Sequence, residues 1–451
     1  MDQIMYYSTN GKAPDVTLAE ALLTGQAPDK GLYMPRTIPQ VTDGELASLK
    51  GKTYPEIAEF ILSKYVLDTF SREVLRDLCV DAYDYDVPLE NVFERTYIMR
   101  LDRGPTASFK DFAARMMGRM IGALMRGQKR ELVILTATSG DTGSAIAHAF
   151  YQIPNIQVMV LFPPAEVSNR QRKQMTTLGD NVSTVGVSGK FDDCQALVKQ
   201  AFADPELSSI RLTSANSINI GRLLPQIVYY FYAYSKLANP GEEIIFSVPS
   251  GNFGDMMGSL LAKRMGLPIR KIIIATNAND EVPNYMGTGV YSKIVPSRVC
   301  ISNAMNVGHP SNFARVIDMY GGWMDESGKI HRQPDMISMR SDMFSVSIND
   351  QQTRMTIKDA WESNRLLLEP HGAVGWAGLK RYIEESGDSG LMVSVETAHP
   401  AKFPEEIEAL LNIVPDIPPS LMGLEEKTEE YFEMPVDYNT FRSILKERYE
   451  P

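Results

Sequence analysis

From residue 131 onwards, short apolar strands alternate with helical segments, and this alternation limits the possible folds more than any other feature. Residues 131–136 (ELVILT) are typical of a buried strand, and residues 142–153 (TGSAIAHAFYQI) are typical of a helix. The alternation continues with strand-like segments at 156–162 and 182–187, which are followed by helical segments at 168–178 and 191–202 respectively. Because such chains form a parallel sheet covered by helices, the sequence predicts an α/β lobe.

A second alternating series predicts a second α/β lobe. Its helical segments are 221–238, 255–266 and 353–364, and its strand-like segments are 242–248, 271–277 and 391–398. The part before residue 95 is different, with helical segments at 18–23, 54–66 and 71–86 joined by Pro/Gly turns. We therefore predict a helical N-terminal domain, a first lobe, a second lobe and a C-terminal helical extension, with bounds of 1–95, 96–240, 241–405 and 406–451.

Length and charge exclude several classes of protein. A chain of 451 residues can form two or three domains. Its formal net charge of -11 argues against a general nucleic-acid partner, which would require a basic surface. The apolar stretch 223–235 is too short to span a bilayer and contains Pro225 and Gln226, so we predict no membrane partner.

Cysteines and histidines favour neither a disulfide framework nor a metal site. Cys79, Cys194 and Cys300 lie far apart in the sequence. The start of the chain has no apolar signal segment, so we expect a cytoplasmic, reducing environment. The five histidines lack a metal-ligand spacing, and we therefore expect no metal and interpret His148 and His399 as packing residues.

A lysine near a predicted helix start is the first candidate for chemistry. In SFKDFAARMMGRM, residues 108–120, Ser108 and Asp111 have the spacing of a capping box. An apolar face is predicted from Phe112, Met116, Met120 and Leu124. Lys110 would then lie in the first turn, where the helix dipole disfavours a positive charge and, if the lysine is buried, favours the nucleophilic neutral amine. A solvated surface lysine is the alternative.

Three polar loops precede predicted helices and could each bind an anion. The loop 136–144 (TATSGDTGS) and the loop 247–255 (SVPSGNFGD) both follow a strand. The loop 214–222 (SANSINIGR) ends in Arg222, whose guanidinium suits a phosphate or a carboxylate. Ordinary turn chemistry is the alternative for each loop alone. None has the Walker or the dinucleotide-binding glycine pattern.

Together, the lysine and the glycine loops resemble the pyridoxal-phosphate (PLP) enzymes of the second fold type. More specifically, five blocks are similar to the signature blocks of the threonine synthase family and occur in its order, at 104–111, 136–145, 213–222, 248–255 and 397–403. The opening phrase TLAEALLTGQAPDKGLYMPRTIP is also similar to that family. The resemblance implies the tryptophan-synthase-β-like PLP fold, with two parallel-sheet lobes and a helical N-terminal domain.

The resemblance implies a set of cofactor-binding residues. Lys110 would bind PLP as a Schiff base and later move protons as a base and an acid. The phosphate loop would consist of Gly251, Asn252, Phe253 and Gly254, followed by Asp255 as a helix-start residue, and Thr397 would lie near the pyridine nitrogen. Asp141 matches the position that faces the phenolic oxygen of the cofactor. Many relatives have asparagine there, so the protonation of Asp141 stays open.

The resemblance also implies a substrate, O-phospho-L-homoserine. Its carboxylate would bind to Thr138, Ser139 and Thr142, with Thr142 also catalytic, and its phosphate would bind to Asn216, Ser217 and Arg222. The implied reaction converts this substrate and water to L-threonine and phosphate, the last step of threonine biosynthesis. A PLP-dependent lyase acting on serine or threonine, and a non-catalytic relative that binds a phosphorylated metabolite, are the alternatives. Either a monomer or a homodimer is compatible with the sequence.

Overall fold

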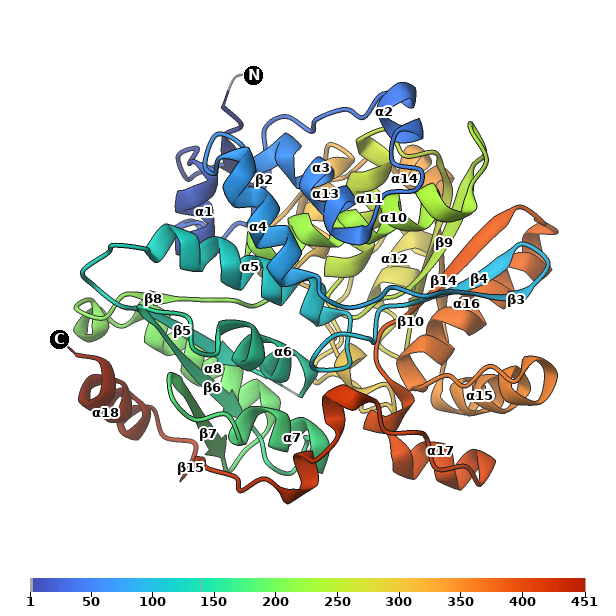
Figure 1. Ribbon diagram of the computed structural model, residues 1–451. Coiled ribbons are helices and arrows are strands. Elements are labelled where there is room, and N and C mark those ends of the chain that lie inside the picture. Colours follow the sequence, from blue (N-terminus) through green and yellow to red (C-terminus); the bar gives the residue numbers. More distant parts are fainter. Residues whose placement is uncertain (1–2, 139, 451) are drawn as a thin grey trace.

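A computed structural model describes residues 3–138 and 140–450 of the chain, which form an α/β structure built on two mainly parallel sheets (Figure 1). The smaller of these two sheets has the strand order β15-β7-β6-β5-β8, and all its pairs are parallel. Its strands are β5 (Leu132–Ala137), β6 (Ile156–Phe162), β7 (Val182–Val187), β8 (Leu212–Thr213) and β15 (Phe432–Met434). The predicted first lobe is therefore present.

Alternate residues of this sheet contact helices on its two faces. Val133 and Leu135 pack in one apolar cluster with α8 and α18, whereas Leu132 and Ile134 pack in another with α5 and α6. The helices of this lobe are α5 (Lys110–Met125), α6 (Asp141–Phe150), α7 (Asn169–Thr176), α8 (Phe191–Ala203) and α18 (Tyr438–Tyr449). Side chains alternate across a strand, so a continuously apolar strand is covered on both faces.

The larger sheet has the strand order β13-β10-β9-β14-β4-β3, with only the β3 pair antiparallel within this sheet. Its strands are β3 (Leu89–Phe93), β4 (Thr96–Arg100), β9 (Ile244–Pro249), β10 (Ile269–Thr276), β13 (Met343–Ser347) and β14 (Leu391–Glu396). One face contacts α15 (Asp350–Asn364), α16 (Pro370–Ser386) and α17 (Pro404–Leu411). The other contacts the core that contains α11 (Gly254–Arg264). This sheet is the second lobe.

The N-terminal helices share one apolar core with both lobes, and α1 and α4 contact α5 while α3 contacts α10 (Val228–Leu237) (Figure 1). The N-terminal helices are α1 (Leu18–Thr24), α2 (Asp43–Ala47), α3 (Tyr54–Val66) and α4 (Arg72–Ala82). Capping boxes begin α1, at Thr17 and Glu20, and α2, at Thr42 and Glu45. A two-stranded antiparallel sheet of β1 (Tyr6–Ser8) and β2 (Tyr33–Pro35) was not predicted.

The predicted helix at 221–238 is interrupted. It consists of α9 (Ile220–Leu223), a 3-10 turn (Leu224–Ile227) and α10 (Val228–Leu237). Pro225 lies in the turn, and because proline has no N–H group it cannot continue the α-helical hydrogen bonding. The remaining elements are α12 (Glu281–Thr288), α13 (Phe313–Met319), α14 (Met336–Asp342), β11 (Trp323–Met324), β12 (Ile330–Arg332) and the 3-10 turns Pro205–Leu207, Asn303–Met305, Pro400–Lys402, Pro419–Leu421 and Leu424–Glu426.

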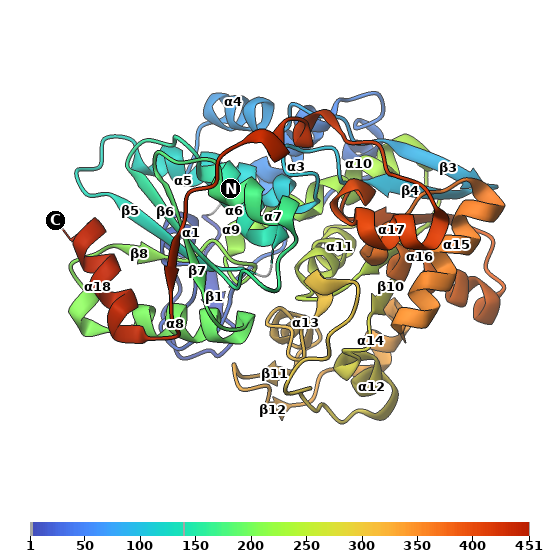
Figure 2. The same cartoon turned by 90° about the horizontal axis from the view of Figure 1, so that it is seen from below.

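The C-terminal segment connects the two lobes. After α17 it runs across the molecule to β15, which pairs with β7 of the small sheet (Figure 2). On the way, Glu425 forms an ion pair with Arg170 at 3.1 Å, and Glu429 forms one with Arg172 at 2.8 Å. The four-part domain division stays a proposal. Strand β4, which it assigned to the first lobe, pairs with β14 of the larger sheet.

No helix in the described part of the chain is long and apolar enough to cross a membrane.

Candidate functional site

Lys110 begins α5 next to the end of β14. The Phe109 N–H donates to the Thr397 carbonyl at 2.8 Å, and the His399 N–H donates to the Ala107 carbonyl at 3.0 Å. Between these two bonds, Ser108 and Ala398 form an isolated antiparallel bridge. Two predicted site residues that are far apart in the sequence, Lys110 and Thr397, are therefore held at the carboxyl end of one strand.

The predicted capping box at this helix start is wrong. No side chain caps α5, and the buried Ser108 hydroxyl has no hydrogen-bond partner among the described residues. The Asp111 carboxylate instead accepts from the Thr106 N–H at 2.8 Å and from the Thr106 hydroxyl at 2.6 Å. Asp111 thus holds the loop before the helix, while Lys110 keeps its predicted place in the first turn. The apolar face is confirmed, because Phe112, Met116 and Met120 are fully buried and Leu124 is half-buried.

The Lys110 side chain is only 13% exposed, and its Nζ lies 3.7 Å from Asp141 Oδ2. Burial is the main effect and lowers the pKa of Lys110 below the usual lysine value. Asp141 opposes this shift, whereas the positive charges of Lys402 and Arg222 add to it. The site therefore favours the neutral amine that nucleophilic or basic chemistry requires.

Asp141, the first residue of α6, has two other partners. The Lys402 Nζ lies 2.6 Å from its Oδ1, and Gln171 Nε2 donates to the same oxygen at 3.0 Å. Burial alone would raise the pKa of Asp141, but the charges of Lys402 and Lys110 hold it well below its usual value. The carboxylate is therefore ionised. Neither Lys402 nor Gln171 was predicted as a site residue, although Lys402 lies within the quoted block TAHPAKF.

The loop before α6 is braced by one of its own residues. The Thr138 hydroxyl accepts from the N–H groups of Gly140 at 2.9 Å and Gly143 at 2.8 Å. Because these bonds occupy the hydroxyl, Thr138 shapes the loop. Thr142, in the first turn of α6, is half-buried, and its hydroxyl makes no hydrogen bond to another described residue. Ser139, the third predicted member of this loop, lies outside the described residues.

The second glycine loop connects β9 to the start of α11. Phe253 adopts a left-handed backbone conformation with φ 63°, which turns the chain into the helix. The N–H groups of Gly251, Asn252 and Phe253 find no acceptor among the described residues. Next to a helix N-terminus, such groups form a site for a phosphate.

Asp255 does not contribute to this loop. Its carboxylate accepts hydrogen bonds from the hydroxyls of Tyr229 and Tyr230 on α10. Burial raises the pKa of Asp255 to about 6. Its side chain therefore stabilises the start of α11 from the side of α10, in agreement with its interpretation as a helix-start residue.

The two glycines of this loop differ in how closely they are packed, which gives a stability prediction. A Cβ atom at Gly251 would lie 2.9 Å from the Met305 Cα, whereas at Gly254 the nearest atom would be 3.5 Å away. We expect Gly251→Ala to lower the free energy of unfolding of the cofactor-free chain by about 1–3 kcal/mol, because backbone must shift. Gly254→Ala is the matched control and should change it by less than about 1 kcal/mol. Urea unfolding measures both variants, and equal losses would contradict the packing argument.

Arg222, on α9, is a buried cation without an anionic partner. Its Nη1 donates to the Ala215 carbonyl at 2.9 Å, its Nε has no partner, and no carboxylate of the described residues forms an ion pair with it. Burial lowers the pKa of Arg222 to about 10, so the guanidinium stays charged at neutral pH. A buried, unpaired guanidinium is costly unless an anion binds there. Arg222 is therefore a candidate for binding an anion.

The third loop places Ser217 and Asn216 beside the glycine loop. A Cβ atom built at Gly254 would lie 3.9 Å from the Ser217 Cβ. The Asn216 side-chain oxygen accepts a hydrogen bond from the Thr136 hydroxyl at the end of β5. The two loops predicted to bind phosphate are thus adjacent.

Arg315, on α13, was missed by the sequence analysis. It is fully buried and donates to the carbonyls of Tyr33 at 3.0 Å, Ser217 at 3.3 Å and Ile218 at 2.8 Å. It therefore fixes the backbone around Ser217 against strand β2 of the N-terminal sheet. No motif surrounds Arg315, so the sequence contained no signal for this role.

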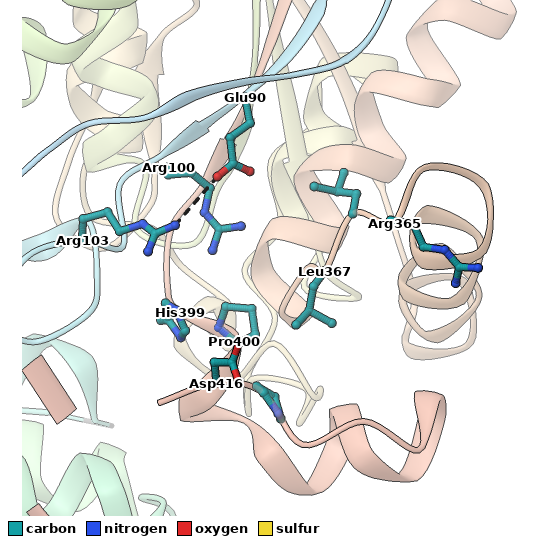
Figure 3. Close-up of a pocket in the computed structure, with 10 residues that line it drawn as sticks. Glu90, Arg100, Arg103, Arg365, Leu367, His399, Pro400 and Asp416 are labelled. Carbon is teal, nitrogen blue, oxygen red and sulfur yellow. Dashed lines mark ion pairs between the residues drawn. The ribbon is translucent and has the colours of Figure 1, made fainter. Parts of the chain in front are cut away.

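A separate cavity of about 310 Å³ lies on the other side of the segment after β14 (Figure 3). Arg103 faces Glu90 there, and Arg365 points away from the group around His399. None of the predicted cofactor or substrate residues lines this cavity, so it is not the reaction site. Its lining residues are Glu90, Arg100, Arg103, Arg365, Leu366, Leu367, His399, Pro400, Pro415 and Asp416.

The two histidines interpreted as packing residues behave differently. His399 caps a 3-10 turn, with its Nδ1 accepting from the Ala401 N–H at 3.1 Å, and burial lowers its pKa to about 4. The interpretation of His148 was wrong, because its side chain is exposed on α6. The described residues contain no group of three His, Cys, Asp or Glu side chains that could hold a metal.

Residues 87–397 match the family model "Pyridoxal-phosphate dependent enzyme", which together with the buried lysine and the glycine loops defines the class: the chain is a PLP-dependent enzyme. Two further models match the flanks, "Threonine synthase N terminus" over residues 5–83 and "Threonine synthase, C-terminal" over residues 372–445. The chain belongs to the threonine synthase family.

Relatives and solved structures agree with this assignment along nearly the whole chain. Threonine synthase of Haemophilus influenzae is 39% identical and covers 97% of this chain and 99% of its own length. The crystal structure of PLP-bound threonine synthase from Brucella melitensis is 33% identical, with a TM-score of 0.92 over 99% of this chain and 100% of that one. The structure from Escherichia coli is 35% identical, with a TM-score of 0.86 over 98% and 99%. The predicted fold and family are confirmed.

Proposed function

We propose that Lys110 binds PLP covalently while the backbone of Gly251, Asn252, Phe253 and Gly254 binds its phosphate. Three observations support the fit: the buried Lys110, the N–H groups of the glycine loop that lack acceptors, and the bond that holds Thr397 beside the lysine. Thr397 would contact the cofactor ring at its nitrogen, and Asp141, paired with Lys402, would contact it at the phenolic oxygen. When bound, the cofactor supplies an electron sink that makes the substrate protons acidic.

We further propose that the substrate is O-phospho-L-homoserine. A molecule with two anionic groups needs two anion sites, and Arg222 carries the argument, because its buried charge forms no ion pair with a described residue and donates only to the Ala215 carbonyl. The phosphate binds to Arg222, Asn216 and Ser217. The carboxylate binds to Thr142 and the start of α6, with Thr138 supporting the loop rather than touching the substrate.

In this arrangement the neutral amine of Lys110 moves the protons. Threonine carries its hydroxyl on Cβ, whereas the phosphate leaves from Cγ. A proton must therefore be removed from Cα and another from Cβ as phosphate leaves, and one must be added at Cγ, before the hydroxide of a water molecule adds at Cβ and a proton returns to Cα. Lys110 is the buried base beside these positions, and the low exposure of the site limits competing reactions with water.

The two alternatives fit the site less well. A lyase that acts on serine or threonine has no phosphate to place beside Arg222. A non-catalytic relative that only binds a phosphorylated metabolite would not require the buried Lys110 with its lowered pKa. Whether the protein is a monomer or a homodimer stays a prediction open to measurement.

Turnover in heavy water tests the reaction. Incubation with phosphohomoserine should release phosphate and form threonine with solvent deuterium at Cα and Cγ, because Lys110 exchanges its protons with solvent. Mass spectrometry and NMR of the product locate the label. Formation of homoserine would overturn the function, since direct displacement leaves the hydroxyl on Cγ. A fully protiated methyl group with an exchanged Cα would contradict free exchange at Lys110.

A further inference from the structure

Lys402 is fully buried in a part of the site where a lysine is costly. Its side chain has no exposed surface, and its Nζ lies 2.6 Å from Asp141 Oδ1. It also donates to the Thr106 carbonyl at 2.9 Å. A charge so deeply buried destabilises a protein unless it is paired and hydrogen-bonded, as this one is. One side chain thus joins the loop before Lys110, the start of α6 and the segment after β14.

The Asp141 carboxylate is shared unequally between two lysines. Its Oδ1 is bound by Lys402 at 2.6 Å and by Gln171 at 3.0 Å. Its Oδ2 lies 3.7 Å from the Nζ of Lys110, which exceeds hydrogen-bond distance. The negative charge is therefore compensated by Lys402, and Lys110 lies beside a pair that is already neutral.

We propose that Lys402 is a positioning residue that binds the Asp141 carboxylate and thereby keeps the Lys110 amine neutral and free to react. The inference rests on the proposed role of Lys110. The plainer explanation is that Lys402 only fastens three segments together. The two explanations predict different effects on the reactivity of Lys110. If Lys402 only fastens segments, loss of Lys402 and loss of Asp141 should change this reactivity in the same direction. If Lys402 compensates the charge of Asp141, the two losses should change it in opposite directions.

Charged groups act on Lys110 from five elements around it. They are Asp141 on α6, Lys402 in the turn Pro400–Lys402, Arg222 on α9, Glu369 at the start of α16 and Asp255 on α11. Replacing Lys402 by methionine removes a repelling charge and frees Asp141 to pair with Lys110, so the pKa of Lys110 should rise. Replacing Asp141 by asparagine removes the attraction, so the pKa of Lys110 should fall.

Chemical labelling of Lys110 in the full-length, cofactor-free chain tests this directly. Reductive methylation with formaldehyde and cyanoborohydride, followed by peptide mass spectrometry, gives the rate at each pH. At pH 8 we expect Lys402→Met to slow labelling of Lys110 about tenfold, because one opposing charge is worth roughly one pKa unit at a buried site. Asp141→Asn should speed it, and the double variant should lie close to the wild type. The labelling rate of the exposed Lys358 on α15 serves as an internal control for the activity of the reagent in each sample.

The outcomes separate the explanations. Equal rates in all variants, or the same direction of change for Lys402→Met and Asp141→Asn, would overturn the proposal. Lys402→Arg, which keeps the charge, should retain fast labelling. Near-ultraviolet circular dichroism shows whether Lys402→Met folds. If it does not, Asp141→Asn and the double variant still test the proposal. Slower labelling of Lys110 in Asp141→Asn than in the wild type would refute the proposal. The labelling does not require turnover. Its result therefore stands even if the heavy-water assay contradicts the proposed reaction.

Discussion

Lys110→Ala is expected to lower kcat for threonine formation by at least about 10,000-fold, because one amine serves as both the cofactor anchor and the proton carrier. Its helix position, its 13% exposure and the charges around it all favour a reactive amine. Phosphate release and threonine formation measure the loss. Borohydride treatment of the wild type should fix the cofactor to the peptide that contains Lys110.

The control for this variant is Lys358→Ala, which removes an exposed lysine from α15 and should leave turnover unchanged. Lys110→Ala should still bind the cofactor weakly, since the glycine loop is intact, and small primary amines added to the assay should restore part of the activity. Recovery of the borohydride label on another lysine, or turnover within tenfold of the wild type, would show that Lys110 is not the anchor.

Much of the architecture was predictable because it depends on local patterns. Strands such as Ile156–Phe162 and Val182–Val187 have the predicted bounds, since each is a short segment rich in β-branched residues between polar turns, which favours a strand. What the alternation does not specify is which strands pair. Strand β4 joins the second sheet and β15 joins the first, across more than 240 residues from their neighbours β14 and β7. Such pairings depend on tertiary packing and not on the local sequence.

The site shows the same division between local and long-range information. Lys110 and the glycine loop were predicted from helix-start and turn chemistry, which is local. Arg315 and Gln171 act through contacts with loops far away in the sequence, and nothing around them distinguishes their roles. The capping prediction failed for a related reason. Ser108 and Asp111 have the correct spacing, but Thr106 and the bridge to Ala398 determine where their polar groups lie.

This dependence on distant contacts also bears on α7, which supplies Gln171. Arg170 and Arg172 of this helix form ion pairs with Glu425 and Glu429 of the C-terminal segment, and Gln171 between them contacts Asp141. The segment that connects the lobes therefore holds the helix that supports the centre of the site. The C-terminal extension thus contributes to the geometry of the site even though none of its residues is proposed to touch the substrate.

Arg222→Ala is expected to weaken transition-state binding of phosphohomoserine by about 2–5 kcal/mol. This corresponds to a reduction of kcat/KM between roughly 30-fold and several thousand-fold. The reason is that the phosphate would lose a charge-assisted partner, whereas the other buried guanidinium beside Ser217, that of Arg315, is already occupied by the carbonyls of Tyr33, Ser217 and Ile218. Arg222→Met keeps most of the side-chain volume and should lose a similar amount, which separates loss of charge from collapse of a cavity. Steady-state kinetics at several substrate concentrations measure both variants.

The specificity of this loss is the decisive point. Slow side reactions with unphosphorylated serine should hardly change in Arg222→Ala, and competitive inhibition by inorganic phosphate should weaken in parallel with kcat/KM. Arg381→Ala, an exposed arginine on α16 that pairs with Glu385, is the control and should alter neither reaction. Equal losses with serine and with phosphohomoserine would mean that Arg222 stabilises α9 instead of binding phosphate. Among the described residues the buried guanidinium has the Ala215 carbonyl as its one hydrogen-bond partner, which leaves donors for an anion that arrives with the substrate, and these kinetics determine whether that anion is phosphate.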